Sequence, residues 1–180
     1  MTPETITLRK ALFLDRDGVI NKEVGYLHKT EDLEYIPGIF ELCIEFQKLD
    51  YLLLVITNQS GIARKYFSES EFQTITKKIH ADFLSKGIAI ARTYHCPHHP
   101  EITGKCQCRK PKPGMILQAK DEFNLDLKNS LLVGDSLRDV EAGNAAGVGQ
   151  TFLLSRKARK SLDFVQIRSL NEILDCNPPS

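Results

Sequence analysis

Short apolar runs recur along the chain, and longer segments with a helical pattern separate them. The runs are bounded by polar or turn-forming residues, which is typical of strands buried in a parallel sheet. We expect five such strands, at residues 10–15, 51–57, 88–94, 130–135 and 149–154.

The intervening segments repeat apolar residues at spacings of three and four, which indicates amphipathic helices. The longest begins at Ser68 and Glu71, which are spaced as an N-terminal capping box, and it ends at Gly87. Three further helices are expected at 38–49, 114–123 and 137–146. Because strands and helices alternate, we predict one Rossmann-like α/β domain over residues 1–180, with a parallel sheet and helices on both faces.

The composition is that of an ordinary globular protein, and it narrows the range of expected partners. Of the 180 residues, 42% are hydrophobic and 26% are charged, and the formal net charge is +1. This balance gives no support for binding nucleic acid or an anionic membrane, and no apolar run has the length of a membrane span. The N-terminal segment lacks the apolar region of a signal peptide, so we expect a cytoplasmic protein.

Polar motifs follow three of the predicted strands at the points where the strands end. The first strand ends in Asp-Arg-Asp-Gly at 15–18, the second in Thr-Asn-Gln-Ser-Gly at 57–61, and the fourth in Gly-Asp-Ser at 134–136. Ligands of such sheets bind beyond the carboxyl ends of the strands, so these side chains are expected to converge. A turn that ends a strand explains any one motif equally well, but three together favour a site. Crowded carboxylates repel one another unless a cation is present, and their hard oxygen atoms suit Mg²⁺.

These groups have the chemistry needed for phosphoryl transfer. Asp15 can attack phosphorus to form an aspartyl-phosphate, and Asp17 can protonate the leaving oxygen and then deprotonate a water. Thr57 can donate a hydrogen bond to a phosphoryl oxygen, and a nearby lysine would balance the charge of the transferring group. The competing hypothesis is a catalytically idle scaffold that binds a phosphorylated ligand or a partner protein, but such a scaffold would not need both acids.

The segment 94–114, YHCPHHPEITGKCQCRKPKPG, concentrates cysteine and histidine. In a cytoplasmic protein, clustered cysteines favour a metal over disulfides. Three thiolates and an imidazole form a full tetrahedral set for Zn²⁺, and they come from Cys96, Cys106, Cys108 and either His98 or His99. Four protein ligands leave no open position, so the ion is expected to be structural. A DNA-reading finger would need a recognition helix and a basic face, whereas this segment is rich in proline.

Arg109 and Lys110 directly follow the last of these cysteines. A free loop of this length would hold two cations poorly, because ordering them costs entropy when the substrate binds. We therefore predict that zinc tethers the loop 95–113 and fixes both cations over the pocket. The alternative is four reduced, solvated side chains that hold no metal.

The three strand-end motifs together resemble, in order and spacing, those of the haloacid dehalogenase superfamily of phosphatases. The resemblance covers most of the chain, from about Ala11 to Gly149. The Cys/His loop followed by CRKPKPG is similar to that of a zinc-containing branch, whose members are heptose bisphosphate phosphatases and histidinol-phosphate phosphatases. The stretches most similar to the heptose enzymes are DRDGVIN at 15–21, TNQSGIAR at 57–64, CPHHP at 96–100 and CRKPKPGM at 108–115.

The resemblance implies a role for each matching residue. Asp15 would be the nucleophile and Asp17 the general acid and base, while Thr57 and Lys110 would bind the transferring phosphate. Mg²⁺ would be held by the Asp15 carboxylate, the Asp17 main-chain carbonyl and Asp135. The implied zinc ligands are Cys96, His98, Cys106 and Cys108. The implied substrate contacts are Glu23, Val24, Gly25, Tyr26, Asn58, Gln59, Ser60, Arg109 and Lys110.

Two positions, one at the end of the last motif and one shortly after it, need separate comment. The heptose enzymes have a substrate-contacting lysine where this chain has Ser136, so that charge is missing here. Asp139 is expected to be a carboxylate at the start of a helix, or one that supports the site from behind its ligands, rather than a direct metal ligand.

The choice of substrate is expected to depend on the loops. The chain is too short for the large cap domain of many related phosphatases, so the loops 22–36 and 95–113 must select the substrate. Histidinol enzymes of the branch have an acid where this chain has Ser60. Arg64 and Lys65 are expected on the pocket side with Arg109 and Lys110, and four such cations would suit a second anion on the substrate. A solvated helix face explains Arg64 and Lys65 equally well.

The sequence therefore predicts a Mg²⁺-dependent phosphatase with a small-molecule sugar phosphate as its substrate. The reaction implied by the resemblance removes the 7-phosphate of D-glycero-D-manno-heptose 1,7-bisphosphate. Histidinol phosphate or another small phosphate ester is the alternative substrate. A monomer is favoured over an oligomer.

Overall fold

Six parallel strands form one sheet in the computed structural model, which describes residues 8–157, 159, 161 and 163–175. The strands are β1 (Ala11–Leu14), β2 (Leu52–Asn58), β3 (Ile90–Cys96), β4 (Leu131–Gly134), β5 (Gln150–Leu154) and β6 (Val165–Ile167). Their order across the sheet is β3-β2-β1-β4-β5-β6. Strands β2 and β3 are added on one side of β1, and strands β4, β5 and β6 are added on its other side. The direction in which the chain adds strands therefore reverses between β1 and β4.

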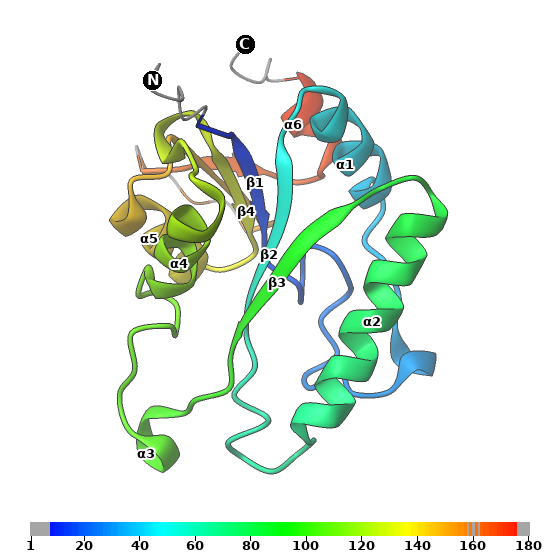
Figure 1. Cartoon of the computed structure of the whole chain (residues 1–180), viewed down its shortest axis with the longest axis vertical. Helices are drawn as coiled ribbons and strands as arrows, with labels where there is room; N and C mark the ends of the chain where they lie inside the picture. Colours follow the sequence, from blue (N-terminus) through cyan, green and yellow to red (C-terminus); the bar gives the residue numbers. More distant parts are fainter. Residues whose placement is uncertain (1–7, 158, 160, 162, 176–180) are drawn as a thin grey trace, which may run out of the picture.

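Helices cover both faces of this sheet (Figure 1). One face carries α1 (Ile39–Lys48), α2 (Glu69–Ser85) and α6 (Asn171–Asp175), and the other carries α4 (Gly114–Phe123) and α5 (Leu137–Ala146). The loops contain the short helix α3 (Pro100–Thr103) and two 3₁₀ turns, η1 (Thr30–Asp32) and η2 (Leu127–Asn129).

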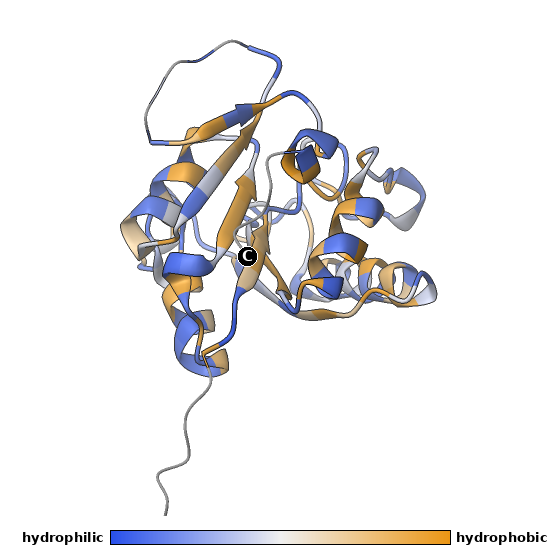
Figure 2. Cartoon of the chain, turned by 90° about the horizontal axis from the view of Figure 1, so that it is seen from above, coloured by the Kyte–Doolittle hydropathy of each residue, from blue (hydrophilic) through white to orange (hydrophobic). Residues whose placement is uncertain are grey.

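Side chains alternate along β1 between the two faces of the sheet, as the pleat requires. Leu12 and Leu14 are buried in the hydrophobic cluster beneath α1 and α2, whereas Phe13 is buried in the cluster beneath α4 and α5. In Figure 2 the strands are largely orange and the helices carry both colours, as expected for a sheet buried between two helical layers.

The predicted α/β fold is confirmed, with differences at the edges of the sheet. The strand predicted at 88–94 lies at Ile90–Cys96 and is an edge strand, so most of its residues are partly exposed rather than buried. Ile88 lies in the turn that follows α2, where its N–H donates to the Phe83 carbonyl and its side chain is buried. The sequence pattern does not reveal β6 and α6, because each is too short to show a period.

Local signals define the helix ends. The predicted capping box is present: Ser68 Oγ accepts the Glu71 N–H at 3.2 Å, and the Glu71 carboxylate accepts the Ser68 N–H at 2.7 Å. A second box joins Ser136 and Asp139 at the start of α5, so the expectation of a helix-start carboxylate at Asp139 is confirmed. This helix ends at Gly147, which adopts a φ of 84°.

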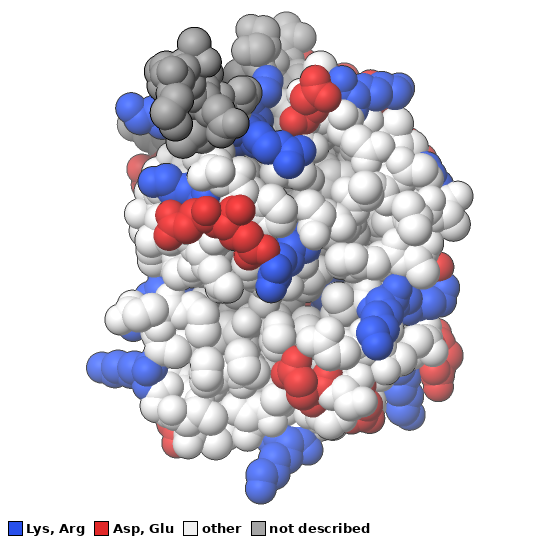
Figure 3. Space-filling model, in the orientation of Figure 1, with Lys and Arg blue, Asp and Glu red and all other residues white. Residues whose placement is uncertain are grey.

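The surface carries both signs of charge. On the face shown in Figure 3, lysine and arginine side chains lie interspersed with aspartate and glutamate. Within the described residues, no helix combines the length and the apolar character needed to cross a bilayer.

Candidate active site and metal centre

A cavity of about 400 Å³ opens at the carboxyl ends of β1, β2 and β4. It lies where the strand order reverses between β1 and β4, which is where open α/β sheets bind their ligands. The cavity is lined by all the residues predicted to act in catalysis or to contact substrate, apart from Val24, which is 52% exposed. The three strand-end motifs therefore converge on one cavity.

Lys110 is buried between two carboxylates of this cavity. Its Nζ lies 2.8 Å from Asp15 Oδ1 and 2.6 Å from Asp139 Oδ1, and it donates to the main-chain carbonyl of Ile56 at 2.9 Å. These three acceptors use all three N–H groups of the ammonium. The lysine side chain is therefore held in one orientation beside Asp15.

The buried carboxylates carry more negative charge than Lys110 offsets. Burial, which Lys110 opposes and Asp139 reinforces, raises the pKa of Asp15 from 3.8 to about 8. Burial and repulsion from Asp139 likewise raise the pKa of Asp135 to about 6. Asp139 behaves differently: burial opposes its ionisation, but the Lys110 ammonium and the hydrogen bonds from Ser136 lower its pKa. One ammonium, that of Lys110, thus faces both Asp15 and Asp139, and the raised pKa values show that Asp15 and Asp135 keep charge for a proton or a cation to offset.

The same carboxylates fit a magnesium ion. Asp15, Asp135 and Asp139 place carboxylate oxygens within 4.8 Å of one another. Gly18 permits this approach, because its φ is +87° and a Cβ there would lie 2.1 Å from Asp135 Oδ2. Lys110 and Ser136 lower the pKa of Asp139, whereas the pKa values of Asp15 and Asp135 are raised, so the last two are the carboxylates whose charge an ion would offset. Hard oxygen donors with uncompensated charge are the ligands that Mg²⁺ prefers.

The raised pKa of Asp135 predicts a gain in stability when its charge is removed. Between pH 3.8 and about 6 the unfolded chain loses this proton before the folded chain does, so the wild type loses stability as the pH rises through that window. We expect Asp135→Asn to raise the free energy of unfolding of the Mg²⁺-free protein by about 1–2 kcal/mol at pH 7.5, after discounting for partial exposure. The gain should shrink as the pH falls toward 5. Urea unfolding at both pH values, with and without Mg²⁺, tests this, and an unchanged midpoint at pH 7.5 would contradict it.

A hydrogen-bond network holds the Asp17 carboxylate. Arg16, which is 2% exposed, donates to both carboxylate oxygens at 2.9 to 3.1 Å. Asn21 donates to Oδ1 at 3.0 Å and Gln59 donates to Oδ2 at 2.9 Å. Gln59 Nε2 also donates to Thr57 Oγ1 at 2.8 Å, so the Thr57 hydroxyl can direct its own proton toward a phosphoryl oxygen. The network joins Asp17 and Thr57 in one buried arrangement.

Asn58 fixes the backbone of Lys110 at the end of β2. Its Oδ1 accepts the Lys110 N–H at 3.0 Å, and its Nδ2 donates to the Lys110 carbonyl at 3.0 Å. This reciprocal pair anchors the loop at Lys110. Arg109 is held at one point, where Nη1 donates to the carbonyl of His98 at 3.2 Å.

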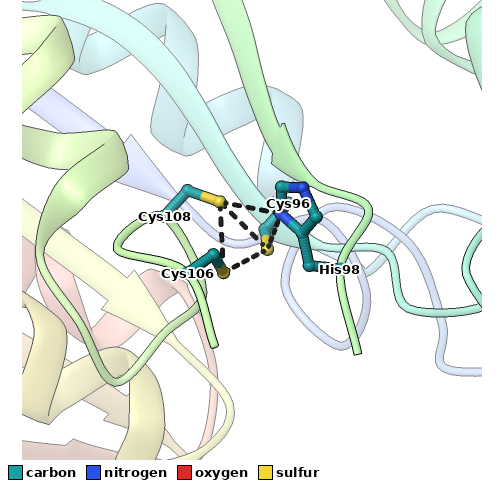
Figure 4. A group of neighbouring side chains, drawn as sticks. All are labelled: Cys96, His98, Cys106 and Cys108. Carbon is teal, nitrogen blue, oxygen red and sulfur yellow. Dashed lines mark hydrogen bonds between the residues drawn. The ribbon is translucent and has the colours of Figure 1, made fainter. Parts of the chain in front are cut away.

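Four side chains of the loop 95–113 meet in a compact cluster (Figure 4). Cys108 Sγ lies 3.2 Å from Cys96 Sγ, 3.5 Å from Cys106 Sγ and 3.3 Å from His98 Nδ1. A tetrahedron of ligands about 2.3 Å from a zinc ion has edges of about 3.7 Å, so the four atoms are nearly at zinc-binding positions. Because Cys96 ends strand β3, the sheet itself positions one corner of the cluster.

The three thiols of the cluster are available as metal ligands. These three cysteines form no disulfide. Burial and hydrogen bonding to its neighbours raise the pKa of the Cys96 thiol, and burial is also the main cause that raises the pKa of Cys108. A divalent ion would convert such thiols to thiolates and offset their mutual repulsion.

Several polar residues near the loop lie away from the cluster and the cavity. His99 Nε2 accepts from Arg64 Nη2 at 2.7 Å, so this ring is turned toward Arg64 rather than the cysteines. His95 pairs with Glu69 at 3.0 Å. The prediction that Arg64 and Lys65 lie on the pocket side is wrong: neither lines the cavity, because Arg64 is held by His99 and Lys65 sits in an exposed turn.

Comparison with known proteins identifies the family. A family model described as "HAD-hyrolase-like" matches residues 107–163. The D-glycero-alpha-D-manno-heptose-1,7-bisphosphate 7-phosphatase of Campylobacter jejuni is 49% identical over 166 residues, which cover 92% of this chain and 94% of that protein. The chain belongs to the heptose-1,7-bisphosphate 7-phosphatase family of the haloacid dehalogenase superfamily.

Other relatives agree with this assignment. The D-glycero-beta-D-manno-heptose-1,7-bisphosphate 7-phosphatase of Vibrio cholerae is 46% identical over 151 residues, which cover 81% of each protein. Among solved structures, the D,D-heptose 1,7-bisphosphate phosphatase of B. bronchiseptica, complexed with magnesium and phosphate, has a TM-score of 0.81 at 28% identity. That match covers 92% of this chain and 98% of the other. Phosphatases of this superfamily use Mg²⁺, in agreement with the carboxylates of the cavity.

Sequence reasoning alone did not assign roles to three residues of the site. Arg16 and Asn21 stand within the stretch DRDGVIN at 15–21, and an arginine between two acids is the signal that could have marked a carboxylate partner. Asp139 was expected at a helix start or in support of the site, but its specific partner, Lys110, could not be named because that contact joins distant segments.

Proposed function

We propose that this enzyme removes the 7-phosphate of D-glycero-D-manno-heptose 1,7-bisphosphate through an aspartyl-phosphate intermediate. The observation that carries the proposal is the Asp15 carboxylate, which lies 2.8 Å from Lys110 Nζ in a cavity that Thr57 and Asp135 also line. The heptose is proposed as the substrate's sugar because the relatives are named for it. Both the alpha and the beta anomer of the 1-phosphate occur among those names.

In the first step an Asp15 carboxylate oxygen attacks the phosphorus of the 7-phosphate. The bond from phosphorus to the sugar oxygen breaks, and Asp17 donates a proton to that oxygen as it leaves. Lys110 and the Thr57 hydroxyl balance the charge on the phosphoryl oxygens. The heptose 1-phosphate then departs, and the phosphoryl group stays on Asp15.

In the second step water regenerates the enzyme. Asp17, now a carboxylate, removes a proton from the water, whose oxygen attacks phosphorus and displaces the Asp15 oxygen as inorganic phosphate forms. The hydrogen bonds from Arg16, Asn21 and Gln59 fix the orientation of the Asp17 carboxylate in the cavity that Asp15 also lines.

Two metals complete the proposal. Mg²⁺, held by Asp15, the Asp17 main-chain carbonyl and Asp135, would supply positive charge between the nucleophile and the phosphate. Zn²⁺, held by Cys96, His98, Cys106 and Cys108, would be structural, because four protein ligands leave it no position for water. Its proposed role is to tether the loop that carries Arg109.

A substrate panel tests this function. We expect Mg²⁺-dependent hydrolysis, with kcat/KM for one heptose bisphosphate anomer at least about 100-fold above that for histidinol phosphate, since only the bisphosphate offers a second anion to the cavity. A small ester such as p-nitrophenyl phosphate should be turned over slowly. Preference for histidinol phosphate would support the alternative enzyme, and no Mg²⁺-dependent turnover of any ester would support the binding scaffold.

A further inference from the structure

Three cationic side chains line the cavity, and they differ in what they already bind. Lys110 is 2% exposed and is paired with both Asp15 and Asp139. Arg109 is held by the carbonyl of His98. Arg138 is exposed, and its side chain has no ion pair or hydrogen bond with any residue that the structure describes. Arg138 is therefore the cavity cation whose charge is least compensated.

The position of Arg138 is not explained by the stability of its helix. It is the second residue of α5, which begins at Leu137. The N-terminal end of a helix carries partial positive charge, so a cation in the first turn is electrostatically unfavourable. The neighbouring residues fit that rule, because Ser136 and Asp139 form the capping box. An arginine here is best explained by an anion that approaches the end of the helix from the cavity.

A heptose bisphosphate brings two phosphates into this cavity, and this step rests on the proposed function. The phosphate to be removed lies against Asp15, Thr57 and Lys110. The second phosphate is joined to the other end of the sugar, so it must lie away from Asp15, among the exposed residues of the cavity. Ser136 offers this phosphate no charge. Its hydroxyl donates its proton to Asp139 Oδ2 at 2.6 Å, so it is not free to donate to the phosphate either.

We propose that Arg138 binds the phosphate that is not removed and thereby selects bisphosphate substrates. Its guanidinium can donate two parallel hydrogen bonds to phosphate oxygens, a geometry that lysine cannot supply. The partial positive charge at the N-terminal end of α5 adds to the attraction. Arg138 approaches from α5 and Arg109 from the zinc loop, so two separate elements supply the cations of this subsite.

The test compares kcat/KM for the heptose bisphosphate with kcat/KM for p-nitrophenyl phosphate in the zinc-loaded, Mg²⁺-supplied enzyme. Arg138→Gln is expected to lower the ratio of these two constants by about 10- to 100-fold, mainly through a higher KM for the bisphosphate. Arg138→Lys should restore part of the ratio, because it keeps the charge and loses the planar fork. Arg156→Gln is the matched control, since Arg156 is an exposed arginine that does not line the cavity, and it should leave the ratio unchanged.

The outcomes separate this inference from the proposed function. If the wild type prefers the bisphosphate and Arg138→Gln keeps that preference, the role of Arg138 is overturned and the proposed function stands. If the wild type shows no preference for the bisphosphate, the proposed function fails and the inference fails with it. An equal fall for Arg138→Gln and Arg156→Gln would mean that only the overall charge of the protein matters, which also overturns the assignment.

Discussion

Asp15→Asn is expected to abolish turnover while the protein keeps its fold. The substitution replaces the nucleophilic carboxylate with a neutral amide but preserves the size of the side chain beside Lys110. Because Asp15 is buried and its pKa is raised to about 8, replacing it with a neutral group should cost the folded protein little. We expect kcat to fall by at least about 10⁴-fold, as for other covalent nucleophiles. Steady-state kinetics with and without Mg²⁺ and a thermal unfolding curve give the two readouts.

Asp17→Asn is the informative comparison for this experiment. It leaves the nucleophile in place but removes the group proposed to move protons in both steps, so phosphorylated enzyme should accumulate when the leaving group needs no acid. Rapid mixing with p-nitrophenyl phosphate should then give a burst of product followed by slow turnover. Turnover by Asp15→Asn at more than a trace of the wild-type rate, after mass spectrometry excludes deamidation, would defeat the aspartyl-phosphate mechanism.

Cys108→Ser is expected to release the zinc and to damage substrate selection more than chemistry. Cys108 contacts each of the other three members of the cluster, so its loss leaves an incomplete ligand set. Arg109 depends on the loop through His98, whereas the backbone of Lys110 is anchored separately by Asn58. We expect kcat/KM for the bisphosphate to fall by about tenfold or more beyond any fall for p-nitrophenyl phosphate.

Elemental analysis provides the second readout for the zinc loop. The wild type should carry about one zinc per chain, and Cys108→Ser should carry much less. Cys43→Ser is the matched control, because Cys43 is a buried thiol in α1, outside the cluster, and its pKa is raised to about 12 by burial. It should retain the zinc. If Cys108→Ser stays folded and both substrates lose the same factor, the loop supports the fold alone and does not select substrates.

Short stretches of the sequence predict much of the fold. Apolar runs and turn residues predict the five longer strands, and the helix from Ser68 to Gly87 is predicted from its period and its capping box. These elements can be predicted because the side-chain periodicity and the capping hydrogen bonds that define them involve residues within about four positions of one another. Polar motifs at three strand ends likewise predict a common site, since the carboxyl ends of parallel strands must share an edge.

Tertiary structure decided how the residues of that site pair. Lys110 meets Asp15 and Asp139 because the crossover after β3 returns the loop to the end of β1, and no local pattern encodes that contact. The same folding turns His98 toward the cysteines and leaves His99 with Arg64, although the two histidines are adjacent in the sequence. The tertiary fold also places β3 at an edge of the sheet, where most of its residues are at least partly exposed and the hydrophobic pattern is weaker.

The sequence by itself determined which chemistry is present: two acids after β1, a hydroxyl at the end of β2, an acid after β4, and three thiols with an imidazole in one loop. Tertiary structure alone determined the electrostatic state of these groups. Burial and neighbouring charges raise the pKa of Asp15 and Asp135 and lower that of Asp139, although all three are the same residue type. The reason is physical: a pKa depends on solvent access and on charges within a few ångströms, and both are set only when distant segments pack together.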